Sequence, residues 1–230
     1  MKYLIKAVAK KIVLVVPPQQ VLKLLFRLDN WLYDRQSRLA VMYGGGTHTK
    51  HRHMRYHDFF VDRIQAGERV LDIGCGIGAV AYDVAERSQA RVVGIDLESR
   101  AVVQAKQLYN HPHVTYCIGN ALNGFFASRF DVVILSNVLE HLPGRPAFLQ
   151  EVQQAIKPGR ILIRVPLFER DWRVPLKREL GIEWRLDLTH ETEYTLESFA
   201  TEMAEASLEI IHLEVRWGEI WAETRSILTS

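Results

Sequence analysis

A glycine-rich loop is the strongest chemical signal in the sequence. Gly74, Gly76 and Gly78 alternate with other residues directly after an apolar run, so bare backbone can approach a ligand before a helix begins. Together with Ala79, the first two glycines match the spacing of a dinucleotide-binding fingerprint. Asp96 ends the next apolar run, as a ribose-binding acid does. The loop therefore predicts a site for a nucleoside-containing cofactor.

Two kinds of cofactor satisfy this glycine spacing, and Asp72 favours one of them. A nicotinamide dinucleotide brings a pyrophosphate, which the carboxylate of Asp72 would repel beside the loop. The same carboxylate suits a ligand that carries an amine and a sulfonium cation. We therefore expect S-adenosyl-L-methionine, and NAD(P) is the alternative.

A second group of ionisable residues follows the fourth apolar run. Methyl transfer from a sulfonium is an in-line displacement, so the protein mainly holds the acceptor and excludes water, and a base is needed only for a weak nucleophile such as a hydroxyl. His141 is the favoured base because imidazole titrates near neutrality and this one follows a strand end that faces the ligand. The alternative is that the Glu-His pair only packs and forms hydrogen bonds. The catalytic candidates are Glu140, His141, His190 and Tyr194.

The elements that must position these residues alternate between β-branched runs and helical segments. Strands are expected at 69–73, 91–96, 113–118, 130–136 and 160–166, and helices near 78–88, 98–110 and 145–156. This rhythm gives right-handed crossovers and a mainly parallel sheet covered on both faces, which is a doubly wound α/β fold. A helix over 195–207, capped by Thr195, and two strands joined at Gly218 close the domain.

The composition fits one large globular domain. Of 230 residues, 48% are hydrophobic and 24% charged, which excludes a disordered or collagen-like chain. The two cysteines, Cys75 and Cys117, suggest neither a disulfide framework nor a thiolate metal site. A reducing, cytoplasmic location is therefore expected.

The N-terminal part of the chain is basic. Residues 1–65 carry 12 Lys and Arg against 4 Asp and Glu, whereas the rest of the chain is acidic overall. Lysines interrupt the apolar residues of 3–16, and any helix there stops at two prolines, so this segment is too short for a membrane span or a signal peptide. Residues 21–42 predict an amphipathic helix. Two interpretations of this extension, residues 1–43, stay open: packing on the main domain as a lid or dimer surface, or peripheral attachment to an anionic membrane.

A basic, histidine-rich loop and a lead-in helix follow at residues 44–65. The three glycines at the start of this segment predict a flexible joint. No metal site is expected there, because the histidines lack neighbouring Cys, Asp or Glu in a ligand-like spacing. A cationic loop beside the ligand cleft is favoured, with Lys50, Arg52 and Arg55 available to a phosphate or carboxylate.

Five motifs in order resemble those of class I S-adenosylmethionine-dependent methyltransferases: VLDIGCGIG, VVGIDLE, GNAL, FDVVILSNVLEHL and KPGRILIRVP. The resemblance covers about residues 56–228 and leaves 1–43 outside. It implies a seven-stranded sheet whose last strand is antiparallel, in a methyltransferase domain at 66–230. The LEHL and HETEYT segments are similar to the group that methylates quinone precursors, lipids, sugars and other metabolites.

The resemblance also implies roles for individual residues. Asp96 would accept two hydrogen bonds from the ribose hydroxyls, and Leu97 would cover one face of the adenine. Asn120 and Ala121 would lie near the adenine edge. The full set of implied cofactor-binding residues is Asp72, Gly74, Gly76, Gly78, Asp96, Leu97, Asn120, Ala121, Ser136 and Asn137.

A metal-free site is expected. In quinone-precursor O-methyltransferases and small-RNA 3′-end methyltransferases, a further carboxylate precedes the Glu-His pair by three residues and helps to bind a metal. This chain has Asn137 at that position, and the loss of a negative ligand disfavours a magnesium site.

The insertion at residues 167–194 is expected to form one wall of the acceptor pocket. Trp172 and Trp184 either stack on a flat ring or sugar or pack the insertion onto the body. The cations offered to an anionic acceptor group are Arg170, Arg173, Lys177, Arg178 and Arg185.

The sequence therefore predicts transfer of a methyl group from S-adenosylmethionine to an oxygen or nitrogen of a small-molecule, saccharide or lipid-linked acceptor. Two alternatives remain beside it. An RNA methyltransferase would fit the basic segment, but SNVLEH stands where an Asn/Asp-Pro-Pro-aromatic motif would be. An NAD(P)-dependent oxidoreductase would fit the glycine loop.

Overall fold

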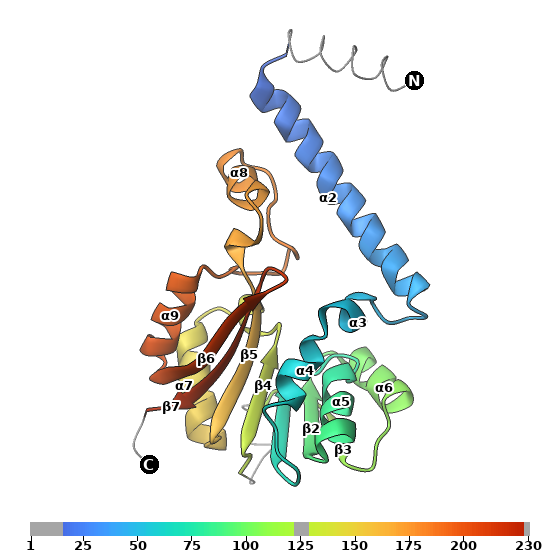
Figure 1. Cartoon of the computed structure of the whole chain (residues 1–230), viewed down its shortest axis with the longest axis vertical. Coiled ribbons are helices and arrows are strands. Elements are labelled where there is room, and N and C mark those ends of the chain that lie inside the picture. The colour runs from blue at the N-terminus through green and yellow to red at the C-terminus, as the bar shows by residue number, and fades with distance from the viewer. Residues whose placement is uncertain (1–15, 122–128, 228–230) are drawn as a thin grey trace. The chain divides into compact units, whose positions relative to one another are not determined.

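The computed structural model describes residues 16–121 and 129–227, which divide into two compact units (Figure 1). The larger unit contains the described residues of 54–170 and 187–230, and the smaller unit those of 1–53 and 171–186. Almost all of the apolar segment 3–16 lies outside the described residues.

The larger unit is built on one seven-stranded sheet with the order β3-β2-β1-β4-β5-β7-β6. β1 to β5 pair in parallel, and β7 lies antiparallel between β5 and β6. The predicted sheet, including its antiparallel last strand and the hairpin at Gly218, is confirmed. The strands are β1 (Arg69–Ile73), β2 (Arg91–Asp96), β3 (Val114–Ile118), β4 (Val132–Ser136), β5 (Arg160–Pro166), β6 (Leu208–Arg216) and β7 (Glu219–Ser226).

Helices fill the crossovers of this sheet close to their predicted positions. The helix predicted at 195–207 forms over Leu196–Glu205, where the Thr195 hydroxyl accepts a hydrogen bond from the backbone N–H of Ser198 and the Ser198 hydroxyl accepts one from Thr195 in return. The helices of this unit are α4 (Tyr56–Val61), α5 (Ala79–Ser88), α6 (Ser99–Leu108), α7 (Arg145–Ile156) and α9 (Leu196–Glu205), with the short 3-10 turns η1 (Leu139–His141) and η2 (Phe168–Arg170).

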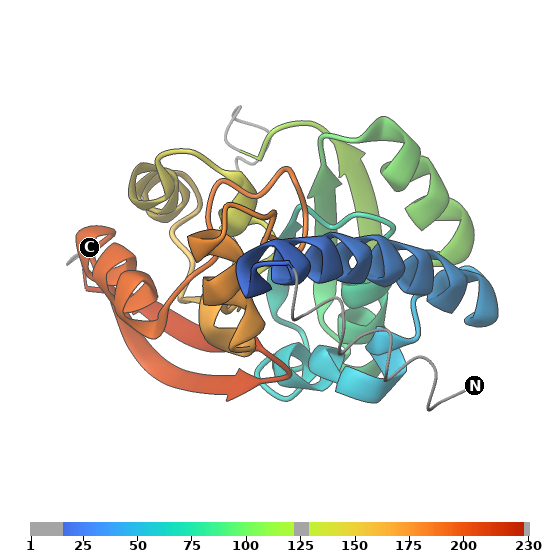
Figure 2. The same ribbon diagram turned by 90° about the horizontal axis from the view of Figure 1, so that it is seen from above.

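Both faces of the central strands are buried, as a doubly wound fold requires. Val70 of β1 belongs to the apolar cluster made with α4, α5 and α6, whereas the next residue, Leu71, belongs to the cluster made with α7 and α9. Val132 and Val133 of β4 alternate in the same way. Figure 2 shows the two helical layers on opposite sides of the sheet. The continuous apolar runs that predicted these strands therefore reflect burial on both sides.

The smaller unit combines α2 (Pro18–Tyr43), the first turns of α3 (Lys50–Met54) and α8 (Arg173–Glu179). The amphipathic helix predicted at 21–42 is confirmed and starts slightly earlier, because a proline is tolerated in the first turn of a helix. Phe26 of α2 is buried against Leu180 and Ile182, which follow α8. None of the described helices combines the length and the apolarity that a membrane span requires.

Candidate functional site

The glycine loop after β1 adopts backbone conformations that side chains resist. Gly74, Gly76 and Gly78 all have positive φ, at 70°, 53° and 85°. A Cβ atom at Gly74 would lie 2.6 Å from a methyl group of Val138, and one at Gly78 would lie 2.6 Å from the Tyr116 hydroxyl oxygen. Nothing lies within 4 Å of the Cβ position at Gly76. The loop thus packs tightly at its two ends and leaves an open approach to its middle.

Asp96 is held at the end of β2 by the loop that it faces. One carboxylate oxygen accepts a hydrogen bond from the Gly76 N–H at 2.8 Å, and the other accepts one from the Glu98 N–H at 2.8 Å. Leu97, the next residue, keeps 75% of its surface exposed. The Gly119 N–H donates to the backbone carbonyl of Asp96 at 3.0 Å, which brings the end of β3, and with it Asn120 and Ala121, beside this acid. A fixed carboxylate next to an exposed apolar side chain suits a ribose joined to a flat base.

Asp72 is a buried carboxyl group without full hydrogen bonding. It is 1% exposed, and its Oδ2 atom has no hydrogen-bond partner among the described residues. Burial, with a smaller contribution from the negative charge of Asp96, raises the pKa of Asp72 to about 8. A cationic ligand beside this group would offset the cost of ionising it, whereas a pyrophosphate would increase that cost.

The end of β4 supplies a second unsatisfied polar atom. Asn137 has a positive φ of 58°, and its N–H donates to the Arg164 carbonyl at 2.8 Å. Its side-chain oxygen Oδ1 is buried without a hydrogen-bond partner among the described residues. The preceding Ser136 accepts a hydrogen bond from Arg164 at 3.4 Å. Unpaired buried acceptors at the ends of β1 and β4 suit a ligand that brings hydrogen-bond donors.

Sequence reasoning missed Arg164 and Tyr56. Arg164 is only 3% exposed, forms two hydrogen bonds with Glu219 at 2.6 and 2.5 Å, and lies 3.7 Å from the ring centre of Tyr56. Burial raises the pKa of Tyr56 and the Arg164 charge opposes that rise. The sequence signal that could have identified Arg164 is its place within the otherwise apolar strand 160–166, because a charge buried there requires a partner.

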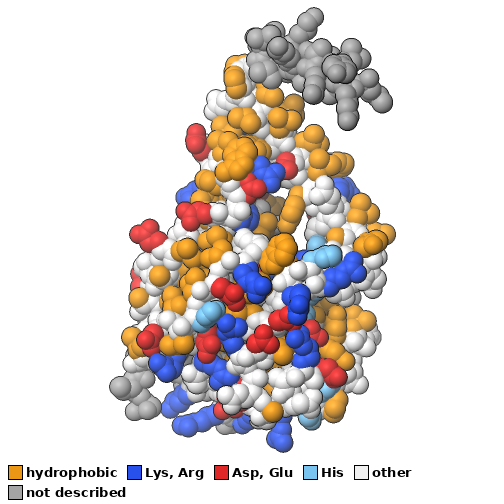
Figure 3. Space-filling model, viewed as in Figure 1, with side chains coloured by type: hydrophobic (Ala, Val, Ile, Leu, Met, Phe, Trp, Pro, Cys, Tyr) orange, Lys and Arg blue, Asp and Glu red, His pale blue; other side chains and the backbone are white. Residues whose placement is uncertain are grey.

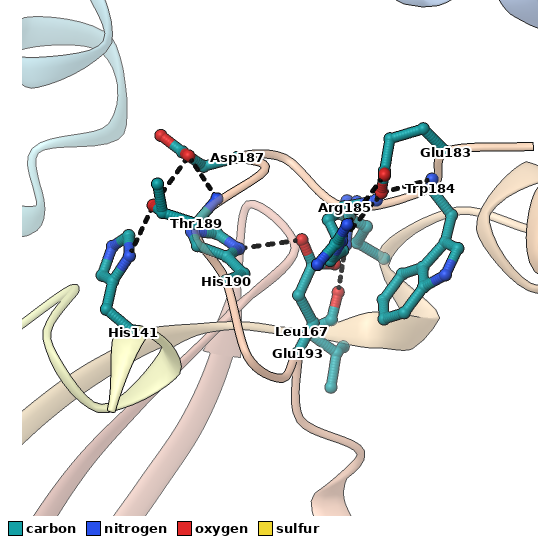
Figure 4. A network of polar contacts seen from close by, with 10 residues as sticks. His141, Leu167, Glu183, Trp184, Arg185, Asp187, Thr189, His190 and Glu193 are labelled. Atoms are coloured by element: carbon teal, nitrogen blue, oxygen red, sulfur yellow. Dashed lines mark hydrogen bonds and ion pairs between the residues drawn. The ribbon is translucent and has the colours of Figure 1, made fainter. Parts of the chain in front are cut away.

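Glu140, His141 and His190 form a second polar centre, with potential ligand atoms that lie within 4.8 Å of one another. Figure 4 shows how His141 and His190 are held. The imidazole rings are edge to face, with centres 4.7 Å apart. The structure therefore brings together three of the four predicted catalytic candidates.

The hydrogen bonds around His141 define its tautomer. Nδ1 of His141 lies 2.9 Å from the Thr189 hydroxyl, and that hydroxyl donates its only hydrogen to Asp187 at 2.8 Å. His141 Nδ1 must then carry a proton and donate to Thr189, which leaves the Nε2 lone pair available. Burial, with a smaller effect from His190, lowers the pKa of His141 below its ordinary value, so the ring is neutral at neutral pH. A neutral imidazole with a free Nε2 can accept a proton.

Glu140 and His190 complete this centre. Both carboxylate oxygens of Glu140 are buried without a hydrogen-bond partner among the described residues, and burial raises its pKa to about 7. Nδ1 of His190 lies 3.1 Å from a carboxylate oxygen of Glu193, which orients the imidazole. Glu193 is paired on its other side with Arg170. The Glu191 N–H donates to the Glu140 carbonyl at 2.8 Å and ties the two segments together.

This centre has donors that fit a divalent cation. It offers two imidazole rings and one carboxylate, and Nδ1 of each imidazole has a neighbouring oxygen that orients the ring, as in many metal sites. This donor set suits zinc, iron or manganese better than magnesium, which prefers oxygen ligands. The sequence-based expectation of a metal-free site stays a prediction.

Tyr194, the fourth catalytic candidate, lies in the core. Its side chain is fully buried, and its hydroxyl donates to Glu202 at 2.9 Å. Glu202 in turn accepts hydrogen bonds from Arg145. The backbone of Tyr194 is joined to Pro166 and Phe168. Tyr194 therefore anchors the loop that carries His190, and its catalytic role stays a prediction.

The cations expected to hold an anionic acceptor mostly have partners of their own. In the larger unit Arg170 pairs with Glu193. In the smaller unit, Arg173 pairs with Asp171 and Asp29, Lys177 with Asp29, and Arg185 with Glu183, while Arg178 lies over the ring of Trp184. Trp172 is exposed. These contacts stabilise the insertion itself and do not support the predicted anion-binding role.

Histidines and arginines of the histidine-rich segment 44–65 also contact partners within the protein. His57 is buried in α4 and lies 2.6 Å from Asp83, and Arg55 pairs with Asp58. His48 shares a hydrogen bond with the hydroxyl of Ser37, and the guanidinium of Arg52 lies over the ring of Tyr43. Within the described ranges, these histidines form no group of three potential metal ligands.

Comparisons with known proteins agree with this geometry. A family model described as a methyltransferase domain matches residues 46–213. The chain is 30% identical over 159 residues to the 2-methyl-6-phytyl-1,4-hydroquinone methyltransferase of Synechocystis sp.. This aligned region covers 64% of this chain and 48% of that protein. It is 34% identical over 127 residues to the ubiquinone biosynthesis O-methyltransferase of Azoarcus sp., which covers 54% of each. The chain thus spans about half the length of these curated relatives.

The fold is also shared with solved structures. The magnesium protoporphyrin IX methyltransferase of Synechocystis PCC 6803, solved with bound SAH, aligns with a TM-score of 0.59 at 18% identity and covers 76% of this chain and 83% of that one. At this identity the likeness concerns the fold alone.

Proposed function

The chain belongs to the family of methyltransferase domains, and from this premise we propose that it moves a methyl group from S-adenosylmethionine to an oxygen or nitrogen of a small-molecule, saccharide or lipid-linked acceptor. The observation that carries the choice of cofactor is the buried Asp72 with its unpaired Oδ2, directly before the glycine loop. The amine and sulfonium of the donor are cations that stabilise an ionised carboxylate. A dinucleotide pyrophosphate would place negative charge beside the same loop.

The cofactor extends across the carboxyl ends of the central strands. Its ribose hydroxyls donate to Asp96, whose two oxygens are already oriented by the Gly76 and Glu98 N–H groups. The adenine lies on the exposed side chain of Leu97, near Asn120 and Ala121. The methionine part lies along the glycine loop, toward Ser136 and Asn137, where Asn137 Oδ1 can accept a hydrogen bond.

The acceptor is held beside His141. When the acceptor is a hydroxyl, its oxygen attacks the methyl carbon in line with the carbon–sulfur bond, the bond electrons stay on sulfur, and the proton passes to Nε2 of His141. Thr189 and Asp187 keep that nitrogen free by holding Nδ1. A divalent cation on Glu140, His141 and His190 would instead lower the pKa of the acceptor hydroxyl directly.

The names of the relatives support a small-molecule acceptor. The two curated relatives above are named for a phytylated hydroquinone and for ubiquinone biosynthesis. A third, named phosphoethanolamine N-methyltransferase 1, from Triticum aestivum, is 32% identical over 110 residues.

Two free cysteines support a reducing, cytoplasmic location.

The test is identification of the methylated product. Purified full-length chain is incubated with methyl-labelled S-adenosylmethionine and a metabolite and lipid extract from cells that lack the gene, with and without a chelator. We expect label in one metabolite or lipid that accumulates unmethylated in those cells. Label that appears only in RNA, or no transfer by a chain that binds NAD, would contradict the proposal.

A further inference from the structure

Helix α2 has two apolar faces, and only one of them is covered within its own unit. Leu22 and Phe26 face α8 and the residues after it, where Phe26 is buried with Leu180 and Ile182. Asn30 continues this face and donates to the Glu183 carbonyl at 2.7 Å. These contacts fix which side of the helix packs against the rest of the smaller unit.

The second apolar face runs along the whole helix, and we call it the outer stripe. Its residues are separated by three, four or seven positions or form adjacent pairs, and all of them fall within about a third of the circumference of a helix with 3.6 residues per turn. Leu24 is 66% exposed, Trp31 54% and Met42 74%. Figure 3 shows hydrophobic side chains on the surface around the N-terminal end of α2. The outer stripe consists of Val21, Leu24, Leu25, Leu28, Trp31, Leu32, Leu39, Met42 and Tyr43.

Basic side chains follow one edge of the outer stripe. Arg27 and Arg38 lie along this edge, and Arg35 lies within the stripe, with its guanidinium 5.6 Å from the ring centre of Trp31. Among the described residues, no carboxylate forms an ion pair with Arg27, whereas Arg38 pairs with Asp34.

Of the two acidic residues of α2, only Asp34 pairs with a cation of this edge. Asp29 accepts from Lys177 at 2.7 Å on the covered side of the helix, and Asp34 is engaged by Arg38. The sequence before α2, residues 1–16, adds four lysines and no acid. The outer stripe is therefore bordered by positive charge that has few partners inside the protein.

We propose that the outer stripe of α2 docks on an anionic lipid surface, with the helix lying in the plane of the interface. Leucines and a tryptophan on one side, with lysines and arginines at the border, are the pattern of helices that bind membranes without crossing them. The long side chains of Arg27 and Arg35 can reach phosphate headgroups while their aliphatic parts stay in the apolar layer. This role goes beyond methyl transfer and does not require it.

Charge argues against a second copy of the chain as the occupant. Two outer stripes packed on each other would bring two sets of uncompensated basic residues to one interface. Arg35 would be buried there among leucines without a carboxylate partner, which is costly. An anionic membrane instead supplies both the apolar layer and the missing negative charge.

The test is flotation of the full-length chain with vesicles, in the absence of S-adenosylmethionine. Vesicles contain either phosphatidylcholine alone or phosphatidylcholine and phosphatidylglycerol in equal parts. We expect the chain to float with the anionic vesicles and to be released as salt is raised. Because binding is measured without donor or acceptor, a failure here leaves the proposed methyl transfer untouched.

Matched variants separate the outer stripe from other surfaces. Arg27→Gln with Arg35→Gln should reduce partitioning roughly twenty-five-fold, at about fivefold for each cation near an anionic surface. Arg100→Gln with Lys106→Gln removes the same number of positive charges from α6, and this control should leave partitioning into the vesicles unchanged. Leu24→Gln with Leu28→Gln should abolish flotation.

The control for the apolar change is Val103→Gln with Leu108→Gln, two exposed apolar residues of α6, which should float like the unchanged chain. Circular dichroism of each variant checks that the fold is retained. Equal flotation of the outer-stripe variants and their controls would overturn the proposal. So would a chain that ignores anionic vesicles and forms a dimer that Leu24→Gln with Leu28→Gln dissociates.

Discussion

Cofactor binding should weaken as the pH falls below about 8, because Asp72 must ionise to face the amine and sulfonium of the ligand. Burial raises the pKa of this carboxyl to about 8 in the free protein. Below that pH the group is neutral, and binding of a cationic ligand must release its proton. The affinity should therefore fall by a factor that approaches tenfold for each pH unit, which amounts to about fiftyfold from about pH 8, where half of the group is already protonated, to about pH 6.

The same carboxyl should make the free protein less stable at neutral pH. Its pKa in the folded state is raised above the ordinary value of 3.8, so ionisation disfavours the folded state increasingly as the pH rises from about 4 to about 8. Asp72→Asn removes this ionisation. The variant should be more stable than the unchanged chain at pH 7 by on the order of 4 kcal/mol, and the difference should vanish in acid.

Calorimetric titration with S-adenosylhomocysteine, which keeps the amine of the donor, measures the affinity at each pH. The unchanged chain should show the steep dependence and Asp72→Asn a flat one, with weaker binding throughout. Glu151→Gln, which removes an exposed carboxylate from α7, should behave like the unchanged chain. An affinity that is independent of pH in the unchanged chain, or an equal slope in Asp72→Asn, would refute the role given to Asp72.

Five further substitutions test the remaining parts of the site. Asp96→Ala should weaken binding of S-adenosylhomocysteine by about 1.5 to 3 kcal/mol, the range for hydrogen bonds to a charged group, and an unchanged dissociation constant would remove its ribose role. Gly74→Ala should destabilise the protein in thermal unfolding more than Gly76→Ala, because its Cβ would lie 2.6 Å from a valine methyl whereas the other site is open; equal melting temperatures would contradict that packing. His141→Ala should lower kcat by roughly a hundredfold or more with little change in cofactor affinity, and an unaltered pH–rate profile would leave it a packing residue. Tyr194→Phe should cost about 1 kcal/mol of stability and leave kcat unchanged, because its hydroxyl makes a buried hydrogen bond away from the acceptor; a large loss of kcat would return it to the catalytic residues.

The fold could be predicted from sequence because its signals are local. Each central strand is a short apolar run that ends at a turn residue, and Val70 and Leu71 show that adjacent residues are buried on opposite faces. The start of α9 could be predicted from Thr195, because a helix cap depends on residues three positions apart in the sequence. The glycine loop was readable because positive φ is expensive for other residues.

The partners of polar side chains could not be predicted because they come from distant parts of the sequence. Thr189 orients His141 across 48 positions, and Glu219 neutralises Arg164 across 55. Asp29, the ion-pair partner shared by Arg173 and Lys177, is likewise 144 and 148 positions away from them, so sequence did not show that these cations have a partner. Sequence shows which residues carry charge, and only the fold shows what each charge contacts.

The most direct test of the account is a parallel titration of the full-length chain with S-adenosylhomocysteine and with NAD at about pH 8, where Asp72 can ionise. We predict saturable binding of the nucleoside thioether at one site and no heat from the dinucleotide. Binding of NAD together with indifference to S-adenosylhomocysteine would contradict the central claim.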